Sequence, residues 1–152
     1  MSTAEQASDN IITLNTRFGV MEIDRSNAIK MPMGMVGFSE HKEFALTVPA
    51  HPALEGYMLL QCITEETLTF ILKPYLYETE VLRPEDLAQV IQKHEIKPEN
   101  LAVMLVTTIR QTPAGPRKSV NMRAPVFIDT ERQIAWQNIF NSDDYNVRHP
   151  VH

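Results

Sequence analysis

The sequence has 152 residues, of which 43% are hydrophobic and 22% are charged, so it can build one hydrophobic core and fits one domain better than two. Its formal net charge of −5 disfavours non-specific nucleic-acid binding, which relies on Lys and Arg side chains to neutralise phosphates. Cys62 is the only cysteine of the chain, which excludes an intrachain disulfide and a multi-cysteine metal site and suits a reducing compartment.

The first ten residues, MSTAEQASDN, are polar and contain neither the basic nor the apolar part of a targeting signal. We therefore expect a flexible extension over residues 1–10, a single domain over residues 11–152 and a cytoplasmic location. The longest apolar runs fall far below the roughly 20 residues needed to cross a bilayer, so no membrane association is expected.

The first half of the chain contains short strand-like segments separated by turns. Residues 11–18 and 20–24 alternate in part between apolar and polar side chains, and they predict a hairpin that turns near Phe18-Gly19. Four further segments have strand composition and are separated by Pro, Gly and Thr-Glu-Glu sequences, namely residues 28–32, 44–48, 57–63 and 68–72. The middle of the chain is therefore predicted to be a meander.

One helix is predicted to begin at Arg83-Pro84. Proline suits the first helical position, and Glu85 and Asp86 place negative charge where the helix dipole favours it. A narrow apolar stripe follows at helical spacing, formed by Leu87, Val90, Ile91 and His94. The helix should therefore lie on the surface of a sheet and end by Pro98.

The second half of the chain returns to strands. Residues 101–109 are almost continuously apolar and predict a buried, central strand. Residues 112–118 contain two prolines, a glycine and two adjacent cations, and predict a flexible linking loop, whereas residues 120–129 and 133–139 predict a second hairpin. Together the elements predict a mainly β fold, an antiparallel barrel-like or half-closed sheet with one surface helix.

The sequence contains no catalytic or cofactor-binding motif. Its five histidines are scattered and form none of the spacings HxH, HxxxH or HExxH that bind metals. Glycine-rich phosphate-binding motifs are also absent from the sequence. We therefore expect no metal, no cofactor and no enzymatic activity.

Cys62 leaves one alternative open. Its neighbours Leu60, Gln61 and Ile63 are typical of a strand interior, where a cysteine acts as a small hydrophobe. The alternative is a small β-barrel hydrolase or ligand-binding domain in which Cys62 acts with His51 or His149.

The segment 31–38 is the first candidate protein-binding site. It places methionines and an aromatic residue in a loop whose proline and glycines prevent regular pairing, and flexible thioether side chains suit adaptable binding surfaces. Our candidates are Met33, Gly34, Met35, Val36, Gly37 and Phe38. The alternative is that these side chains plug the open end of the barrel.

Two later segments are also candidates. In residues 121–126, a proline within a strand-like run indicates an edge or a bulge, which either recruits a partner or is protected. In residues 145–150, the tail either packs back onto the domain or presents cations to an acidic partner. The candidate residues of the two segments are Asn121, Arg123, Ala124, Pro125, Tyr145, Arg148 and His149.

The order of six short motifs resembles the FliW family. Members open with F-G-x-x-E-[IV], continue with P-x-G-[ILM]-x-G-F and pass through L-Q-[SC], a proline-aromatic pair, N-x-x-A-P-[IV] and Y-x-x-[RK]-H-P. The matching segments here begin at Phe18, Pro32, Leu60, Pro74, Asn121 and Tyr145. This chain departs from the family pattern with Val36 in place of a common proline and Cys62 in place of the usual serine.

The resemblance implies a regulator that acts by binding other proteins. FliW-like proteins bind newly made flagellin in the cytoplasm and, once flagellin is exported, bind the RNA-binding repressor CsrA, which releases flagellin translation. The expected partners are therefore flagellin and CsrA, with no direct nucleic-acid contact. An acidic chain suits this role, because it attracts a basic RNA-binding protein without competing for RNA.

Overall fold

Residues 10–151 are described by the structure, which is a computed structural model. The strands, in chain order, are β1 (Ile11–Thr16), β2 (Gly19–Asp24), β3 (Ile29–Lys30), β4 (Glu43–Thr47), β5 (Met58–Cys62), β6 (Thr69–Pro74), β7 (Leu101–Thr112), β8 (Gly115–Val120), β9 (Val126–Asp129), β10 (Ile134–Gln137) and β11 (His149–Pro150). The helix α2 spans Pro84–Lys93. Apart from Asn10, the predicted extension over residues 1–10 lies outside the described residues.

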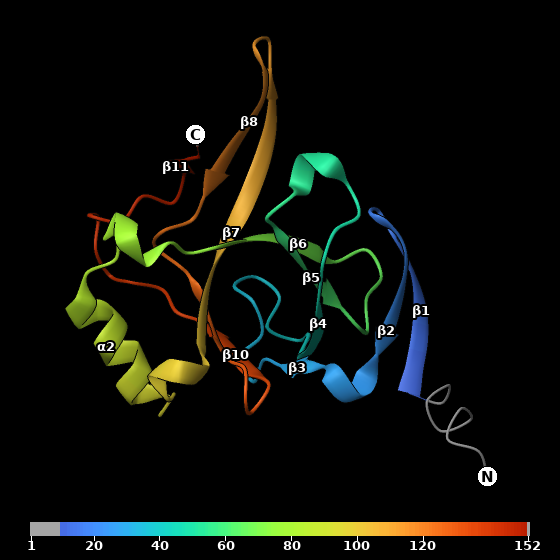
Figure 1. The fold of residues 1–152 in the computed structure, drawn as a ribbon, viewed down its shortest axis with the longest axis horizontal. Helices are drawn as coiled ribbons and strands as arrows, with labels where there is room; N and C mark the ends of the chain where they lie inside the picture. The colour runs from blue at the N-terminus through green and yellow to red at the C-terminus, as the bar shows by residue number, and fades with distance from the viewer. Residues whose placement is uncertain (1–9, 152) are drawn as a thin grey trace.

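Seven strands close into a ring (Figure 1). Their order is β7-β6-β5-β4-β3-β10-β9, and β9 pairs back with β7. All the pairings are antiparallel except the single parallel bridge between β10 and β3, Ile134↔Lys30. The prediction of a mainly β, barrel-like fold with one surface helix is confirmed, and a closed ring leaves few strand edges for unwanted pairing.

The interior of the ring is apolar and follows the alternation of the strands. Phe44, Leu60 and Leu72 are fully buried there, on three neighbouring strands. Met31 and Met35 come from the loop between β3 and β4, which crosses the centre of the ring in Figure 1. The alternative considered for this segment, that its side chains plug the barrel, therefore applies to these two methionines.

Two of the further clusters of buried residues lie under α2 and under the opening hairpin, on the outside of the ring. The outer face of β7 and β9 packs under α2 and the C-terminal segment, with Val103, Phe127 and Tyr145 buried between them. On another side, the hairpin of β1 and β2 buries Leu14 and Ile23 against β4 and the end of β5. This opening hairpin and the meander of β4, β5 and β6 agree with the sequence predictions.

The helix α2 forms as its sequence predicts. Arg83 is its N-cap and Pro84 its first residue, and Val90 is buried on the predicted stripe. The helix ends at Lys93, earlier than the predicted boundary at Pro98, and Glu95 follows with a positive φ of 53°. Residues with positive φ leave the helical conformation, so the chain turns back toward β7 at this point.

The prediction of a flexible loop at residues 112–118 is wrong. β7 continues to Thr112 and β8 returns from Gly115, so the two strands form a hairpin that projects beyond the ring (Figure 1). Pro113 and Gly115 occupy the second and fourth positions of the turn, where a type I turn favours these residues. We call residues 108–119 the arm.

The second predicted hairpin is found only in part. β9 and β10 pair from Val126↔Gln137 to Asp129↔Ile134. Residues 121–125, however, form no strand, because the chain leaves β8 at Val120 and makes a turn before β9. The strand-like run around Pro125, which predicted an edge or a bulge, is therefore not present, and Pro125 itself is buried.

Candidate protein-interaction site

The tail motif splits into an anchor and an exposed part. Tyr145 is buried, and its hydroxyl donates a hydrogen bond to the Asp86 carboxylate and accepts one from the Arg83 backbone N–H at 2.9 Å. The Arg83 guanidinium also donates to Asp86 at 3.1 Å and to Asp144 at 3.0 Å. These contacts fix the C-terminal segment to the start of α2, so the packing role weighed for the tail is found for Tyr145.

The same contacts shift the pKa values of Asp86 and Tyr145. The hydrogen bond from Tyr145 holds the pKa of Asp86 below its ordinary value, with a further contribution from Arg83. Burial raises the pKa of Tyr145, and its bond to Asp86 adds to this. The Asp86 carboxylate and the Tyr145 phenol therefore stay in the charge states that their hydrogen bond requires around neutral pH.

Arg148 and His149 occupy a different environment from Tyr145. The Arg148 side chain is exposed, and its backbone N–H is held by the Asn146 side chain at 2.9 Å. His149 begins β11, which pairs with the end of β8 through His149↔Val120 and Pro150↔Ser119. β11 therefore places Arg148 beside the base of the arm.

Three hollows adjoin one another around β11. The first, of about 290 Å³, is lined by Thr108, Ile109, Arg110, Arg117, Lys118, Ser119, Arg148 and Pro150. The second, of about 210 Å³, is more apolar and includes Leu76, Val81, Met122 and Val151. The third, of about 470 Å³, lies beside Tyr57 and shares Arg117, Lys118 and Pro150 with the first. We call this combined region the β11 surface.

Lys118 and Tyr57 are in contact on this surface. The Lys118 ammonium donates to the backbone oxygen of Ala53 at 2.9 Å and lies 4.8 Å from the centre of the Tyr57 ring. Lys73 lies 5.2 Å from the same ring on the strand β6. Such cation–π contacts orient the two lysines on the β11 surface.

The turn at residues 121–125 is held by its own hydrogen bonds. The Asn121 side chain accepts from the backbone N–H groups of Arg123 and Ala124 at 3.0 and 3.1 Å. The Arg123 side chain donates to the backbone oxygen of Tyr145 at 3.0 Å, and Ala124 is buried. Asn121 and Arg123 therefore support the tail, and a binding role for this segment stays a prediction.

The loop at residues 31–38 also divides into two sets. Met35 is buried with 2% of its surface exposed, whereas Met33 is 71% and Val36 is 55% exposed. Phe38 is 37% exposed, and its ring packs edge-on against Phe70 at 5.5 Å. Of the predicted binding residues here, Met33, Val36 and Phe38 therefore present apolar side chains to solvent.

The glycines of this loop shape its backbone. Gly34 has a φ of +65°, and a Cβ there would lie 2.6 Å from the Phe38 backbone oxygen. Gly37 has a φ of +86° with open space around it. Both conformations favour glycine, so Gly34 and Gly37 position the exposed side chains and contribute little contact area themselves.

Cys62 lies in the core and lacks access to solvent. It is 0% exposed inside the ring, and its sulfur lies 3.4 Å from the Thr64 hydroxyl, which in turn lies 3.5 Å from His41. His51 caps a short 3-10 helix by accepting from the Ala53 N–H, and His149 is in β11. The contacts of Cys62 are those of a small core side chain.

Residues 10–151 contain neither a cluster of metal-binding side chains nor a helix fit to cross a membrane. No group of three or more His, Cys, Asp or Glu side chains in this range is arranged to hold a metal ion. In the same range, no helix combines the length and the apolar character that crossing a bilayer requires. The helix α2, with 10 residues, falls far short of that length.

The arginines of the arm were not among the predicted site residues. Arg110 and Arg117 lie directly opposite each other on β7 and β8, and both line the first hollow with Arg148. A proline and a glycine spaced as in a turn, between segments that carry Arg110 and Arg117, were the signal that could have revealed this hairpin.

Comparison with known proteins agrees with the fold and with the motif order. The sequence profile of the family described as FliW protein matches residues 12–151. The flagellar assembly factor FliW of Clostridium botulinum is 30% identical over 143 residues, covering 92% of this chain and 96% of that protein. The protein of the same name from Syntrophus aciditrophicus is 29% identical over 138 residues, covering 90% of this chain and 84% of that protein.

A solved structure has the same fold. The crystal structure of a flagellar assembly factor FliW superposes with a TM-score of 0.70 at 20% identity, covering 92% of this chain and 95% of that one. The family profile spans almost all of the described residues, from the opening hairpin to the residue after β11. This chain belongs to the FliW protein family.

Proposed function

We propose that this chain is a flagellar assembly factor that binds flagellin in the cytoplasm and antagonises the translational repressor CsrA by protein–protein contact, thereby regulating flagellin synthesis. Its membership of the FliW family supports the proposal, since relatives in that family bear the name flagellar assembly factor. The two named partners come from the resemblance of the sequence motifs. They are the part of the proposal that experiment has to test.

The β11 surface is the observation that carries the proposal. It combines an apolar hollow beside Leu76 and Val151 with a basic hollow beside Arg117 and Arg148. Leu76 and Tyr77 are about half exposed at its margin, at 48% and 50%. Protein-binding surfaces combine an apolar centre with a polar rim in this way, and an exposed apolar region of this kind is a common mark of an interface.

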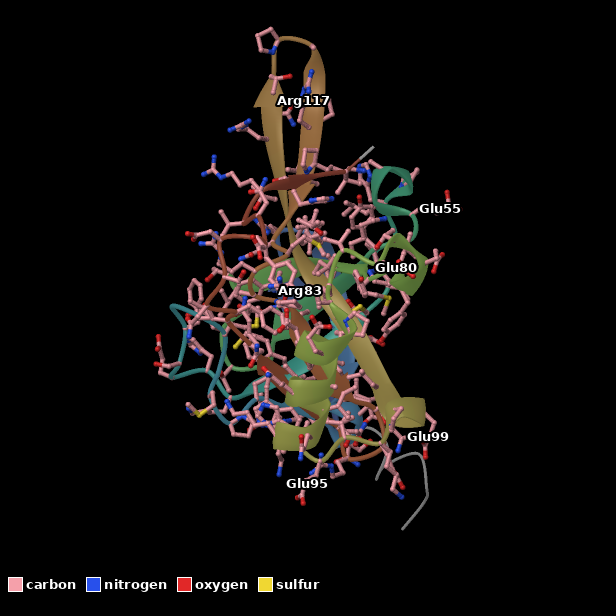
Figure 2. All side chains as sticks on the ribbon, turned by 90° about the vertical axis from the view of Figure 1, so that its left-hand side faces the viewer. Glu55, Glu80, Arg83, Glu95, Glu99 and Arg117 are labelled. Atoms are coloured by element: carbon pink, nitrogen blue, oxygen red, sulfur yellow. The ribbon has the colours of Figure 1, made fainter. Side chains whose placement is uncertain are left out.

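The charge distribution supports two kinds of contact. The chain carries a net charge of −5, and Glu95 and Glu99 lie at the end of the molecule opposite to Arg117 (Figure 2). The net negative charge attracts a basic partner such as an RNA-binding repressor, and the basic arm attracts an acidic one. The protein can therefore attract two kinds of partner.

No observation favours the alternative hydrolase or ligand-binding function of Cys62. The side chain is enclosed by the barrel core, and a nucleophile needs access to its substrate. The Cys62→Ala variant separates the two functions. Under the proposed function, folded Cys62→Ala protein binds both partners as the unaltered protein does, whereas a function that uses the thiol is lost.

Calorimetric titration of the purified protein with flagellin, and separately with CsrA from the same organism, tests the proposal directly. We expect saturable binding with a Kd between the nanomolar and micromolar ranges, which corresponds to roughly 8 to 12 kcal/mol. Circular dichroism of the same sample establishes that it is folded. The absence of measurable binding to both partners in a folded sample would contradict the proposal.

A further inference from the structure

The arm is not required to close the barrel. β6 pairs with β7 only up to Thr107, and β9 pairs with β7 only between Leu101 and Met104. From Thr108 to Thr112, β7 is paired with β8 alone, through Thr108↔Ser119 to Thr112↔Gly115. A two-stranded ribbon that projects from the sheet contributes little to the core. Closure of the barrel therefore does not explain why the exposed side chains of the arm are basic.

The outer part of the arm places two like charges face to face. Arg110 and Arg117 are direct cross-strand partners, and both side chains are exposed. Like charges at such positions destabilise a ribbon, by roughly 0.2 to 1 kcal/mol. None of the ion pairs between described residues involves either arginine. The pair therefore has no counter-ion within the described part of the chain.

A third arginine completes a basic hollow on the same side of the arm. Thr108 and Ser119 are opposite each other two pairs below the two arginines, and alternation in a strand puts residues two positions apart on one face. Arg148 lines the same hollow from the segment before β11. Three arginines and two residues with hydroxyl groups are thus among those that line a space of about 290 Å³. Guanidinium forks match carboxylates in geometry and charge.

The stretch of sequence that forms the arm carries no acidic side chain. Between Glu99 and Asp129 the chain has four cations and no acidic residue, although it has 19 acidic residues in all. Figure 2 shows Arg117 on the arm, far from Glu95 and Glu99 at the opposite end. A local excess of positive charge on an acidic protein attracts anionic groups selectively to the arm.

We propose that this hollow is the docking site for an acidic, extended segment of a protein partner, whose carboxylates are bound by Arg110, Arg117 and Arg148. The inference rests on the proposed function, in that the chain acts by binding proteins. It goes further by naming the surface and the chemistry of the partner segment. Lys118 lies beside this site but is held by Ala53 and Tyr57.

Side chains, and not strand addition, provide the recognition. The Val151 N–H donates to the Lys118 oxygen at 3.1 Å, so the C-terminal segment already occupies this part of the edge of β8. The next outward-facing residue along that edge is Pro116, which has no N–H to donate. This protects the edge against added strands.

An acidic peptide fits the arm better than RNA does. Single-stranded nucleic acids are bound by aromatic side chains that stack on the bases, and residues 108–119 contain no aromatic residue. The net charge of −5 also opposes a long phosphate backbone, while a short acidic segment meets only the local positive charge. Binding of RNA is a separate outcome of the test.

The test compares two double variants that each remove two positive charges. The first is Arg110→Gln with Arg117→Gln in the arm. The second is Lys93→Gln with Lys97→Gln, two exposed lysines near the end of α2. Both variants are first shown to be folded by circular dichroism. Flagellin and CsrA are then titrated into each, at about 0.05 M and about 0.2 M salt, where screening lengths differ by roughly a factor of two.

We expect the arm variant to weaken the binding of at least one partner by about tenfold or more and to reduce the salt dependence of its Kd. The α2 variant keeps its affinity within about threefold, because charges at the far end contribute only through screened long-range attraction. Arg148→Ala lowers affinity for the same partner as the arm variant does.

Three results would overturn the inference. If the unaltered protein binds its partners and the arm variant binds them equally well, the docking site lies elsewhere and the proposed function survives. If the folded, unaltered protein binds neither partner, the proposed function and the inference both fail. If the unaltered protein binds poly(U) RNA and the arm variant loses this binding while keeping its protein partners, the arm is a nucleic-acid site.

Discussion

The hydroxyl of Tyr145 donates a hydrogen bond to the carboxylate of Asp86, which lies 59 residues earlier in the chain. Asp86 is in the first turn of α2 and Tyr145 is in the segment that leads to β11. The same contact therefore holds both the helix and the C-terminal segment against the barrel. It also separates the tail motif into a structural tyrosine and an exposed arginine, Arg148.

Tyr145→Phe should lower the free energy of unfolding by about 1 to 3 kcal/mol. The substitution keeps the ring but removes the acceptor for the Arg83 N–H and one of the two donors to Asp86, which keeps its contact with the Arg83 guanidinium. Urea unfolding followed by circular dichroism measures the change. Tyr77→Phe is the matched control, because the Tyr77 ring is 50% exposed. An equal loss in both variants would contradict the anchor role.

Gly34→Ala should destabilise the protein more than Gly37→Ala. Both positions have positive φ, which costs an alanine roughly 1 kcal/mol or more, but only at position 34 would the new Cβ meet backbone atoms at 2.6 and 2.7 Å. Thermal unfolding of the two variants compares them within one loop. Equal melting temperatures would show that the loop moves freely enough to relieve the contact.

The stability of the protein should fall in acid partly through Asp129. Burial alone would raise the pKa of this carboxyl group, but hydrogen bonds from Arg132 and Glu131 outweigh it and hold the pKa below its ordinary value. A lowered pKa in the folded state means that the carboxylate stabilises the protein at pH values above about 3.9, the value for an unfolded chain. This contribution is lost as the pH falls through the folded-state pKa.

The variant Asp129→Asn tests this contribution. At pH 7 we expect a loss of about 1 to 3 kcal/mol, because the charged partner of Arg132 is gone. Between pH 5 and pH 3, the unfolding free energy of the variant should then fall less steeply than that of the unaltered protein. Urea unfolding across this range gives the slope of unfolding free energy against pH for both proteins. Parallel slopes would show that Asp129 does not contribute to the loss of stability in acid.

Arg117→Thr should stabilise the protein slightly, by a few tenths of a kcal/mol up to about 1 kcal/mol. The change relieves the repulsion with Arg110 and places a strand-favouring residue in β8. Lys30→Thr serves as the control with the same change of charge, since Lys30 lies opposite Glu43 and its loss should destabilise. Urea unfolding of the two variants should therefore give shifts of opposite sign. A loss of stability in Arg117→Thr would mean that the arginines are not repelling each other.

The helix and most of the strands were predictable because their signals are local. Pro84, the acidic first turn and the apolar stripe lie within a few turns of one another, and each acts through neighbouring backbone groups. Alternation along β4, β5 and β6 likewise fixes which side chains face the core once any sheet forms. The motif order identified the family for the same reason, since motifs are read along the chain.

The arm shows where local signals are ambiguous. Residues 112–118 have the proline, glycine and lysine content of a linker, and the tip of a hairpin has the same composition. Only the pairing of Arg110 with Arg117 and of Thr108 with Ser119 distinguishes the two structures. Pairing depends on contacts across the turn, which composition does not record.

The sequence by itself determined the family, the helix and the apolar pattern of the barrel. Tertiary structure decided which candidate residues are exposed. Met35 is buried while Met33 is exposed. Tyr145 is buried, while Arg148 lines the same hollow as the arginines of the arm. Burial depends on what packs against a residue from distant segments, such as β11 on β8 or the tail on α2. These contacts form between parts of the chain that no local periodicity connects, and so only the folded chain brings them together.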